Sequence, residues 1–251
     1  MTRVAMFALA LSAAASAADY KDVNKTLPLQ GNGSLQIETH KGSIHVSVWD
    51  RQEVEIQARI QAEPGAPMDR RQFDGTDVRI DSSADSVHVK TSYPDSNWCC
   101  SDNGNNPEVR YTVRMPKTAK LIIHDHRSET EVSGLQGALD ITTHRGGVRL
   151  HGLGGALHLD DYRGDVQVEF ASFTANSSIT TYRGNVELSM PGSSRFDLQT
   201  NSGRHGSIAT DFSVMARTFV RRGEGVHGTV NGGGPTLRIE TERGDIRLRG
   251  K

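Results

Sequence analysis

Apolar and polar residues alternate along most of this chain, and the alternation is organised into a repeated unit. Each unit has two short alternating stretches joined at a corner, and in most clear copies the corner has the sequence Thr-x-Arg-Gly. The clear copies span Leu139–Leu150, Leu157–Val168, Ser177–Leu188 and Leu237–Leu248, and weaker copies begin at Leu35, Leu121 and Phe196. Because successive side chains of a strand point to opposite faces, the pattern predicts two short strands per unit, each with one buried face.

The corner residues recur at a nearly constant interval. The turn positions of the successive copies are Gly42, Ser128, Gly146, Gly164, Gly184, Gly203 and Gly244. From Ser128 onward the intervals are 18, 18, 20, 19 and 41 residues, and the last is about two periods, with Arg222-Gly223 near its midpoint as a candidate degenerate copy. One turn cannot bury its apolar face alone, so a constant period predicts stacked turns that share a core.

We therefore predict an all-β fold, a β-solenoid similar to a parallel β-helix, with turns of about 18–20 residues. Gly146, Gly164 and Gly184 are expected to stack at one corner. Next to that corner, the expected core-lining residues are Val148, Val166 and Val186. An antiparallel β-sandwich also uses short alternating strands, but the constant period and the repeated corner favour the solenoid.

The N-terminal third alternates without the repeated corner. Its alternating stretches are predicted to form hairpins that start the solenoid and cover its end. They lie at residues 37–48, 54–60, 78–80, 87–89 and 109–115, and residues 66–73 are the one stretch expected to form a short helix. We divide the mature chain, 18–251, into N-terminal strands and hairpins (18–118) and regular solenoid repeats (119–251) of a single domain.

The first residues have the pattern of a secretory signal. One basic residue precedes an apolar run over Val4–Ala15, and Ala15-Ser16-Ala17 fits the cleavage rule for signal peptidase, so residues 1–17 are predicted to be a cleaved signal peptide. The run is too short for a membrane anchor, since spanning a bilayer takes ~20 apolar residues. We expect no transmembrane segment and an exported protein, located in the periplasm, at the cell surface or outside the cell.

Composition narrows the classes of partner. The chain has 29 Lys+Arg and 30 Asp+Glu, and this balance gives no reason to expect nucleic acid as a partner. Glycine is abundant, at 26 residues, while aromatic residues make up 6%, which favours many turns and strands over helices.

Three stretches carry a resemblance to a known family. They are Leu35–Val46 with Val54–Ala58, Val113–Leu121, and Gly232–Leu248. In these stretches the sequence resembles bacterial β-strand-repeat domains labelled putative adhesins, whose function is largely unknown, and the likeness covers nearly the whole mature chain. The resemblance implies a stacked β-strand fold and an adhesin-like role, and it brings no catalytic residues and no cofactor.

The corner of each turn is the most suggestive candidate for a binding site. The residues directly before the turn positions are Lys41, Arg127, Arg145, Arg163, Arg183, Ser202 and Arg243, and the residues before those are His40, His126, His144, Tyr162, Tyr182, Asn201 and Glu242. In a solenoid, equivalent residues stack ~4.8 Å apart, which would produce a basic stripe edged by imidazole and phenol rings. The candidate binding residues are Arg145, Arg163, Arg183, His144, Tyr162 and Tyr182.

Two roles for this stripe remain open. Arginine supplies bidentate donors, so the partner could be an anionic glycan, a lipid headgroup or an envelope protein. Alternatively, the row is a structural ladder in which the guanidinium groups stack on neighbouring rings and pair with the outward carboxylates of Asp160, Asp165 and Glu187.

Metal and thiol chemistry find little support in the sequence. His124 and His126 share a strand face, but zinc needs about four ligands and no others are apparent, so no metal is predicted. Cys99 and Cys100 are the only cysteines. An intrachain disulfide would therefore be vicinal and strained, because adjacent Cα atoms lie ~3.8 Å apart. Free thiols and interchain pairing are equally open.

Catalytic motifs are also missing. There is no Gly-x-Ser-x-Gly and no phosphate-binding glycine loop, and Asp160 and Asp161 should face opposite sides of one strand. The sequence favours an exported, non-enzymatic cell-envelope or surface protein that acts as an adhesin-like binding protein or a structural scaffold. The alternative is a carbohydrate-active β-helix enzyme, a polysaccharide lyase or hydrolase, which would need carboxylates and arginines that converge in a groove.

Overall fold

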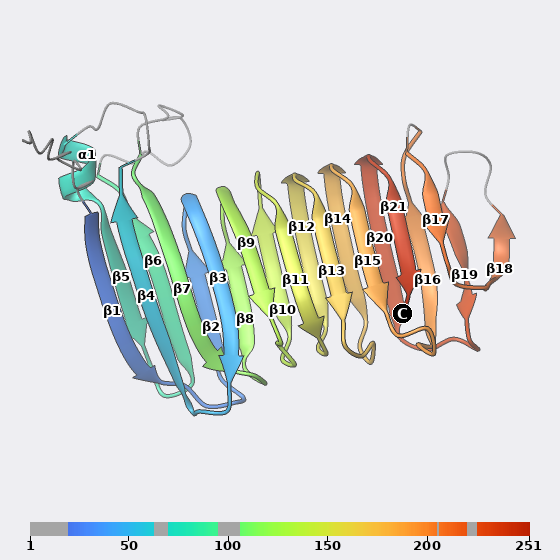
Figure 1. Cartoon of the computed structure of the whole chain (residues 1–251), viewed down its shortest axis with the longest axis horizontal. Helices are drawn as coiled ribbons and strands as arrows, with labels where there is room; N and C mark the ends of the chain where they lie inside the picture. Colours follow the sequence, from blue (N-terminus) through green and yellow to red (C-terminus); the bar gives the residue numbers. More distant parts are fainter. Residues whose placement is uncertain (1–19, 63–69, 95–105, 205, 220–224) are drawn as a thin grey trace, which may run out of the picture.

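The computed structural model describes residues 20–62, 70–94, 106–204, 206–219 and 225–251, with the backbone alone at 216–219. Within these ranges the chain forms two long sheets that face each other across one core, and Figure 1 shows their strands stacked side by side along the longest axis. The predicted signal peptide, Cys99 and Cys100 lie outside the described residues.

The first sheet has ten strands. In spatial order they are β1 (Tyr20–Pro28), β4 (Glu53–Gln61), β7 (Glu108–Pro116), β3 (Lys41–Trp49), β9 (Arg127–Ser133), β11 (Val148–Leu153), β13 (Val166–Phe170), β15 (Val186–Met190), β21 (Ile246–Gly250) and β17 (Ile208–Thr210).

The second sheet has eleven strands. In spatial order they are β18 (Val214–Phe219), β19 (Val226–Val230), β16 (Phe196–Asn201), β20 (Thr236–Arg243), β14 (Ser177–Arg183), β12 (Leu157–Arg163), β10 (Leu139–Thr143), β8 (Lys120–His124), β2 (Ser34–Glu38), β6 (Ser86–Ser92) and β5 (Asp77–Ser82). The one described helix, α1, spans Arg70–Gly75 and begins inside the stretch expected to be helical.

The central turns confirm the β-solenoid. Each turn places one strand in each sheet, and equivalent strands of successive turns pair in parallel. Val148 pairs with Val166, and Val166 pairs with Val186; all three are fully buried, as predicted. An antiparallel sandwich is excluded for these turns, because the neighbouring strands within each sheet run in the same direction.

The corner glycines stack as the period predicts. The Gly146 amide donates to the Arg163 carbonyl at 3.2 Å, and the Gly164 amide donates to the Arg183 carbonyl at 3.0 Å. A Cβ atom on Gly164 would lie 1.9 Å from the carbonyl oxygen of Gly146, and one on Gly184 would lie 1.8 Å from that of Gly164. Glycine is required at these positions because each corner presses directly against the corner of the preceding turn.

The N-terminal strands are arranged differently from the prediction. β5 and β6 form an antiparallel hairpin, as expected. The stretches 37–48 and 54–60 do not form a hairpin with each other, because β7 lies between β3 and β4. β3 already has parallel neighbours on both edges, β7 and β9, so β4 pairs antiparallel with β7 and with β1.

The C-terminal turn is out of sequence order. β20 pairs with β14, and β21 pairs with β15, so Ser177 lies opposite Leu237. β16 and β17 lie outside this turn, which Figure 1 shows as the red pair β20 and β21 placed before β16. The expectation that the 41-residue interval continues the stack in sequence order is therefore wrong. Arg222-Gly223 lies outside the described residues.

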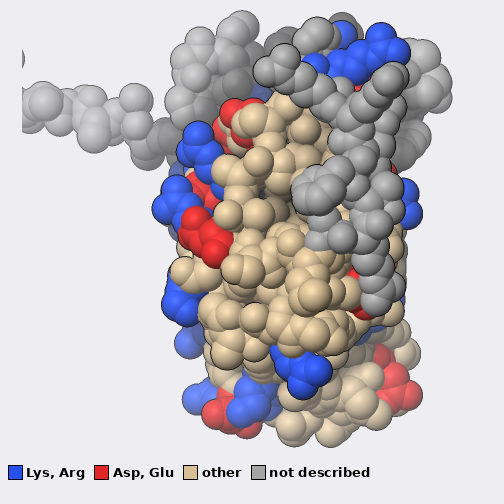
Figure 2. All heavy atoms as spheres, turned by 90° about the vertical axis from the view of Figure 1, so that its right-hand side faces the viewer, with Lys and Arg blue, Asp and Glu red and all other residues tan. Residues whose placement is uncertain are grey.

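The end formed by these strands is poor in charge. Figure 2 looks onto it and shows Lys, Arg, Asp and Glu mainly around the periphery, with uncharged described residues across the middle. Beneath it, Phe170, Phe173, Phe196 and Phe212 pack edge to face with ring centroids 5.2–5.7 Å apart. These aromatic contacts continue the core of the solenoid to its last turns.

Candidate functional site: a basic corner ladder

The rings at the corner form one continuous stack. His40, His126, His144, Tyr162 and Tyr182 lie face to face, and we call them the ring stack. Their successive centroid distances are 4.6, 4.8, 4.7 and 5.0 Å, with interplanar angles of 17° or less. Tyr93 packs edge-on against His40 at 6.0 Å, so the parallel stacking ends there. The structure thus brings together the three predicted ring residues, His144, Tyr162 and Tyr182.

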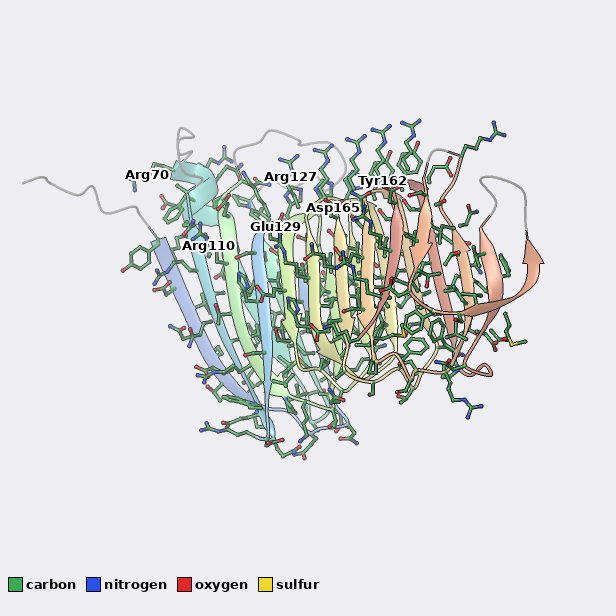
Figure 3. All side chains as sticks on the ribbon, turned by 45° about the vertical axis from the view of Figure 1, so that its right-hand side comes forward. Arg70, Arg110, Arg127, Glu129, Tyr162 and Asp165 are labelled. Carbon is green, nitrogen blue, oxygen red and sulfur yellow. The ribbon has the colours of Figure 1, made fainter. Side chains whose placement is uncertain are left out.

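The next residue of each turn forms a second ladder beside the ring stack. Its members, which we call the arginine row, are Arg127, Arg145, Arg163, Arg183 and Arg243. The strand register aligns Arg127 with Arg145, Arg163 with Arg183, and Arg183 with Arg243. Figure 3 shows Arg127 and Tyr162 at this corner, where side chains project beyond the ends of the strands.

Both ends of the row differ from the sequence-based prediction. Lys41 aligns with Arg127 but is 7% exposed, so it adds little to the basic surface. Ser202 was expected between Arg183 and Arg243, but the C-terminal turn brings these two arginines into direct register. The row is therefore an uninterrupted series of arginines.

The salt-bridge alternative is not supported by the contacts of the row. Among the described residues, no carboxylate forms an ion pair with Arg145, Arg163, Arg183 or Arg243. The carboxylates proposed for that role have other partners. Asp160 faces a histidine of its own strand at 3.3 Å, Glu187 pairs with an arginine of β21 at 2.8 Å, and Asp165 accepts a backbone amide of the next turn at 2.8 Å. The idea of an internal salt-bridge ladder is wrong for these residues.

Two of the guanidinium groups lie over rings of the stack, as the structural-ladder alternative predicted. Arg163 lies 5.3 Å from the centroid of the Tyr162 ring, and Arg183 lies 5.5 Å from that of Tyr182. Such cation–π contacts stabilise exposed groups by ~0.5–1 kcal/mol each. The Nε atoms of Arg145 and Arg183 are buried without a hydrogen-bond partner in the structure. The Nε–H groups of these two arginines are therefore unsatisfied hydrogen-bond donors within the described residues.

Two carboxyl groups lie on the inner side of the same corner, the half-buried Asp125 and the buried Asp161. Asp125 accepts hydrogen bonds from the Ser128 amide at 2.7 Å, the Ser128 hydroxyl at 2.6 Å and the Thr143 hydroxyl at 3.1 Å. Burial raises the pKa of Asp125 to about 6, against the lowering effect of these hydrogen bonds. Burial likewise raises the pKa of Asp161 to about 6, and this group accepts the Arg163 amide at 3.0 Å.

These two carboxyl groups were not predicted as features of the site. The alternation did contain the signal, because both residues occupy the inward position that Thr143 and Thr181 occupy in other turns. Asp161 is 6% exposed and the neighbouring Asp160 is half-buried, so the two face opposite sides of the strand, as expected.

The middle one of the three stacked histidines, His126, is neutral at neutral pH. Burial lowers the pKa of His126 to about 4, and the flanking His40, His144, Arg127 and Arg145 lower it further in the same direction. His126 therefore adds no charge to this corner at neutral pH.

Other candidate chemistry is sparse in the described part of the chain. No group of three His, Cys, Asp or Glu side chains is placed to hold a metal ion there, and no helix among these residues is long and apolar enough to cross a membrane. A groove of about 460 Å³ crosses the second sheet near the first residues of its strands. Asp140 is the one carboxylate among the residues that line this groove.

Stacked parallel turns around one core, with a ladder of like residues at a corner, define a β-solenoid protein. The chain belongs to the Toastrack DUF4097 family, whose model matches residues 26–249. No curated protein matches the sequence significantly.

Solved structures with a similar chain path come from bacteria. A putative cell adhesion protein from Clostridium sporogenes is 11% identical, with a TM-score of 0.49 over 92% of this chain and 100% of that chain. A putative adhesin from Bacteroides fragilis is 12% identical, with a TM-score of 0.43 over 92% and 97% of the two chains. A putative lipid binding protein from Parabacteroides distasonis is 9% identical, with a TM-score of 0.26 over 90% and 96%. At these values the likenesses do not assign an activity to this chain.

Proposed function

We propose that this protein is an exported, non-enzymatic protein of the bacterial cell envelope or surface that binds anionic partners along the arginine row. The observation that carries the proposal is the series Arg145, Arg163, Arg183 and Arg243, which is aligned turn by turn without an ion pair to any described carboxylate. Like charges on adjacent strands repel one another, so a bound anion would stabilise the row that the protein itself leaves uncompensated.

The ring stack supports an anionic partner over an apolar one. The internal rings have both faces occupied by their neighbours at 4.6–5.0 Å, so they present their edges to solvent. The edge of an aromatic ring is its positive part, and tyrosine and histidine also carry polar atoms there. The corner therefore offers hydrogen-bonding and positive groups and no large apolar face.

The enzyme alternative has less support from the same contacts. Asp125 and Asp161 are covered by the corner itself and are bonded to groups within it. The groove on the second sheet is lined by a single carboxylate, Asp140, whereas acid–base cleavage of a glycosidic bond uses a pair. A binding role fits these surroundings better than catalysis.

The test compares two variants with the same net charge. The ladder variant carries Arg145→Gln, Arg163→Gln and Arg183→Gln. The surface variant carries Arg79→Gln, Arg238→Gln and Arg247→Gln, none of which belongs to the arginine row. Binding of both variants and the wild type to immobilised anionic polysaccharide and to phosphatidylglycerol vesicles is measured at low and high salt.

We expect the ladder variant to lose most of the binding and the surface variant to retain it, and we expect high salt to weaken the wild type, since exposed charge contacts are screened. Equal binding by both variants and the wild type to every anionic probe would overturn the proposal. Export is tested separately, by secretion from a bacterial host and N-terminal sequencing, where the mature chain should begin at Ala18.

A further inference from the structure

We propose that the arginine row binds a linear acidic polysaccharide with one carboxylate per sugar, which lies across the strands with one sugar for each turn of the solenoid. The inference rests on the proposed function and names the class of ligand. It comes from three features of the corner: the regular spacing of the charges, the second row of polar ring edges, and the two ends of the ladder.

The spacing favours a polymer over a single anion. Parallel pairing places every arginine at the same position of its turn, and the ring centroids show that successive turns at this corner are 4.6–5.0 Å apart. A pyranose unit in an extended chain advances by a similar distance, so each sugar lies opposite one turn. Consecutive sugars of a β-1,4-linked chain are turned by about half a rotation, so the long arginine side chains reach carboxylates on alternate edges of the ligand. Phosphates of one strand of a nucleic acid duplex rise by ~3.4 Å each along the helix axis, which differs from this repeat.

The ring stack adds a second requirement that a sugar chain meets. Tyr162 is 39% exposed, and Tyr162 and Tyr182 lie on consecutive turns beside Arg163 and Arg183. Each of these turns therefore offers a guanidinium for a carboxylate and a phenol for a hydroxyl group. An acidic sugar carries both groups on one ring. A single phospholipid headgroup contributes one charge at one point, so it does not match a whole row of arginines.

The ends of the ladder set the length of the site. On one side, Tyr93 packs perpendicular to His40, and Lys41 is buried beneath the surface. On the other side, β20 places the exposed carboxylate of Glu242 at the position that tyrosine occupies in β14 and β12. Glu242 shares its turn with Arg243 and would repel an acidic sugar there, so the site extends over the four turns from Arg127 to Arg183.

The experiment measures how affinity depends on the length of the ligand. Oligouronates with two to six β-1,4-linked sugars and one carboxylate per sugar are titrated into the full chain by calorimetry at low salt. Each added sugar should raise the affinity by about two- to fivefold, the range of one exposed ion pair, until four sugars are present. Neutral oligosaccharides of equal length should not bind.

Two variants test the assignment of the rows. The double variant Tyr162→Phe and Tyr182→Phe keeps the stacked rings and removes their hydroxyls, and it should weaken oligouronate binding by about 5- to 150-fold, the range of two neutral hydrogen bonds. It should leave the binding of poly-glutamate unchanged, because that polymer has carboxylates without sugar hydroxyls. The single variant Arg163→Gln interrupts the row at its middle and should remove the gain from the third sugar onward.

The outcomes separate this inference from the proposed function. Suppose that vesicle binding is lost in the ladder variant, but that diuronates bind the wild type as tightly as hexauronates do. The row then binds anions, and the inference of a polymeric ligand is overturned. If binding increases with length and the tyrosine variant loses affinity for oligouronates alone, the inference is supported. If the ladder variant binds every probe as the wild type does, the proposed function itself fails.

Discussion

Neutralising the arginine row tests the electrostatics of the corner independently of any ligand. The ladder variant removes Arg145, Arg163 and Arg183 and thereby relieves four neighbouring repulsions, two of them with Arg127 and Arg243. Two unit charges 4.8 Å apart repel by about 0.9 kcal/mol in water. Screening at physiological ionic strength, with a Debye length of about 8 Å, reduces this to about 0.5 kcal/mol per pair, so about 2 kcal/mol is recovered.

The same substitutions remove stabilising contacts. Arg163 and Arg183 lose their cation–π contacts with Tyr162 and Tyr182, which are worth about 1–2 kcal/mol together. The two effects nearly cancel, so the free energy of unfolding of the ladder variant should lie within about 1 kcal/mol of the wild type at physiological salt. At low salt the repulsion is less screened, and the variant should gain about 1 kcal/mol relative to the wild type.

The assay is urea unfolding followed by far-UV circular dichroism at both salt concentrations, with the surface variant as control. The control removes equal charge from positions outside the row and should show no comparable gain at low salt. A salt-bridge ladder would behave in the opposite way, because its loss destabilises most at low salt. If the ladder variant loses more than about 2 kcal/mol, and loses most at low salt, the absence of compensating carboxylates is refuted.

Three further predictions concern the turns beneath the ladder. Val166→Asp buries an unpaired carboxylate and should destabilise the fold by about 3–5 kcal/mol, whereas an unchanged melting temperature with soluble expression would contradict its inward position. Gly164→Ala places a Cβ 1.9 Å from the Gly146 carbonyl and should lower the melting temperature, while Gly192→Ala, whose nearest contact is 3.4 Å, should not. The pKa of Asp125 is raised from 3.8 to about 6, so its stabilising contribution is full below about pH 4 and is lost as the pH rises to about 6. Asp125→Asn should therefore flatten the decline in unfolding free energy across that window, and an unchanged pH profile of the variant would show that the group titrates normally.

The corner could be predicted from the sequence because its residues fix the register. Neighbouring corners approach so closely that only glycine fits at Gly146 and Gly164. A register shift of one residue would also turn Val148 away from the core. The same register necessarily aligns the rings and the arginines. The buried position of Asp161 also followed from the alternation, although its raised pKa depends on burial that only the packed structure shows.

The order of the last turns could not be predicted in the same way. Alternation shows which side of a strand is buried, but it does not show which neighbour the strand selects. Thr241 and Arg243 match Thr181 and Arg183, so the C-terminal turn pairs with β14 across 60 residues of sequence, and β16 lies outside it. β1 was missed because a strand at the edge of a sheet is only half-covered, and its alternation is weak.

The contacts of the arginine side chains could not be predicted from the sequence either. Carboxylates lie within a few residues of the arginines in the sequence, as Asp160, Asp165 and Glu187 do, and the pattern alone allowed either pairing or separation. In the structure Glu187 of β15 forms an ion pair with Arg249 of the neighbouring strand β21 at 2.8 Å, on the side away from the corner. Exposed side chains choose their partners through rotamers, which neither period nor alternation determines.

The unfavourable interactions of this solenoid are concentrated at one corner. Arg145 and Arg183 each have a buried Nε without a partner, and both lie in a row of like charges. On the inner side, Asp125 and Asp161 are carboxyl groups with raised pKa values. The neighbouring core positions follow the simple rule of buried valine, leucine and isoleucine. A repeat fold could place uncharged residues at every corner and gain stability, and departures from local rules tend to coincide with functional sites. The corner therefore differs from the rest of the fold in the way expected of a surface that is completed by its ligand.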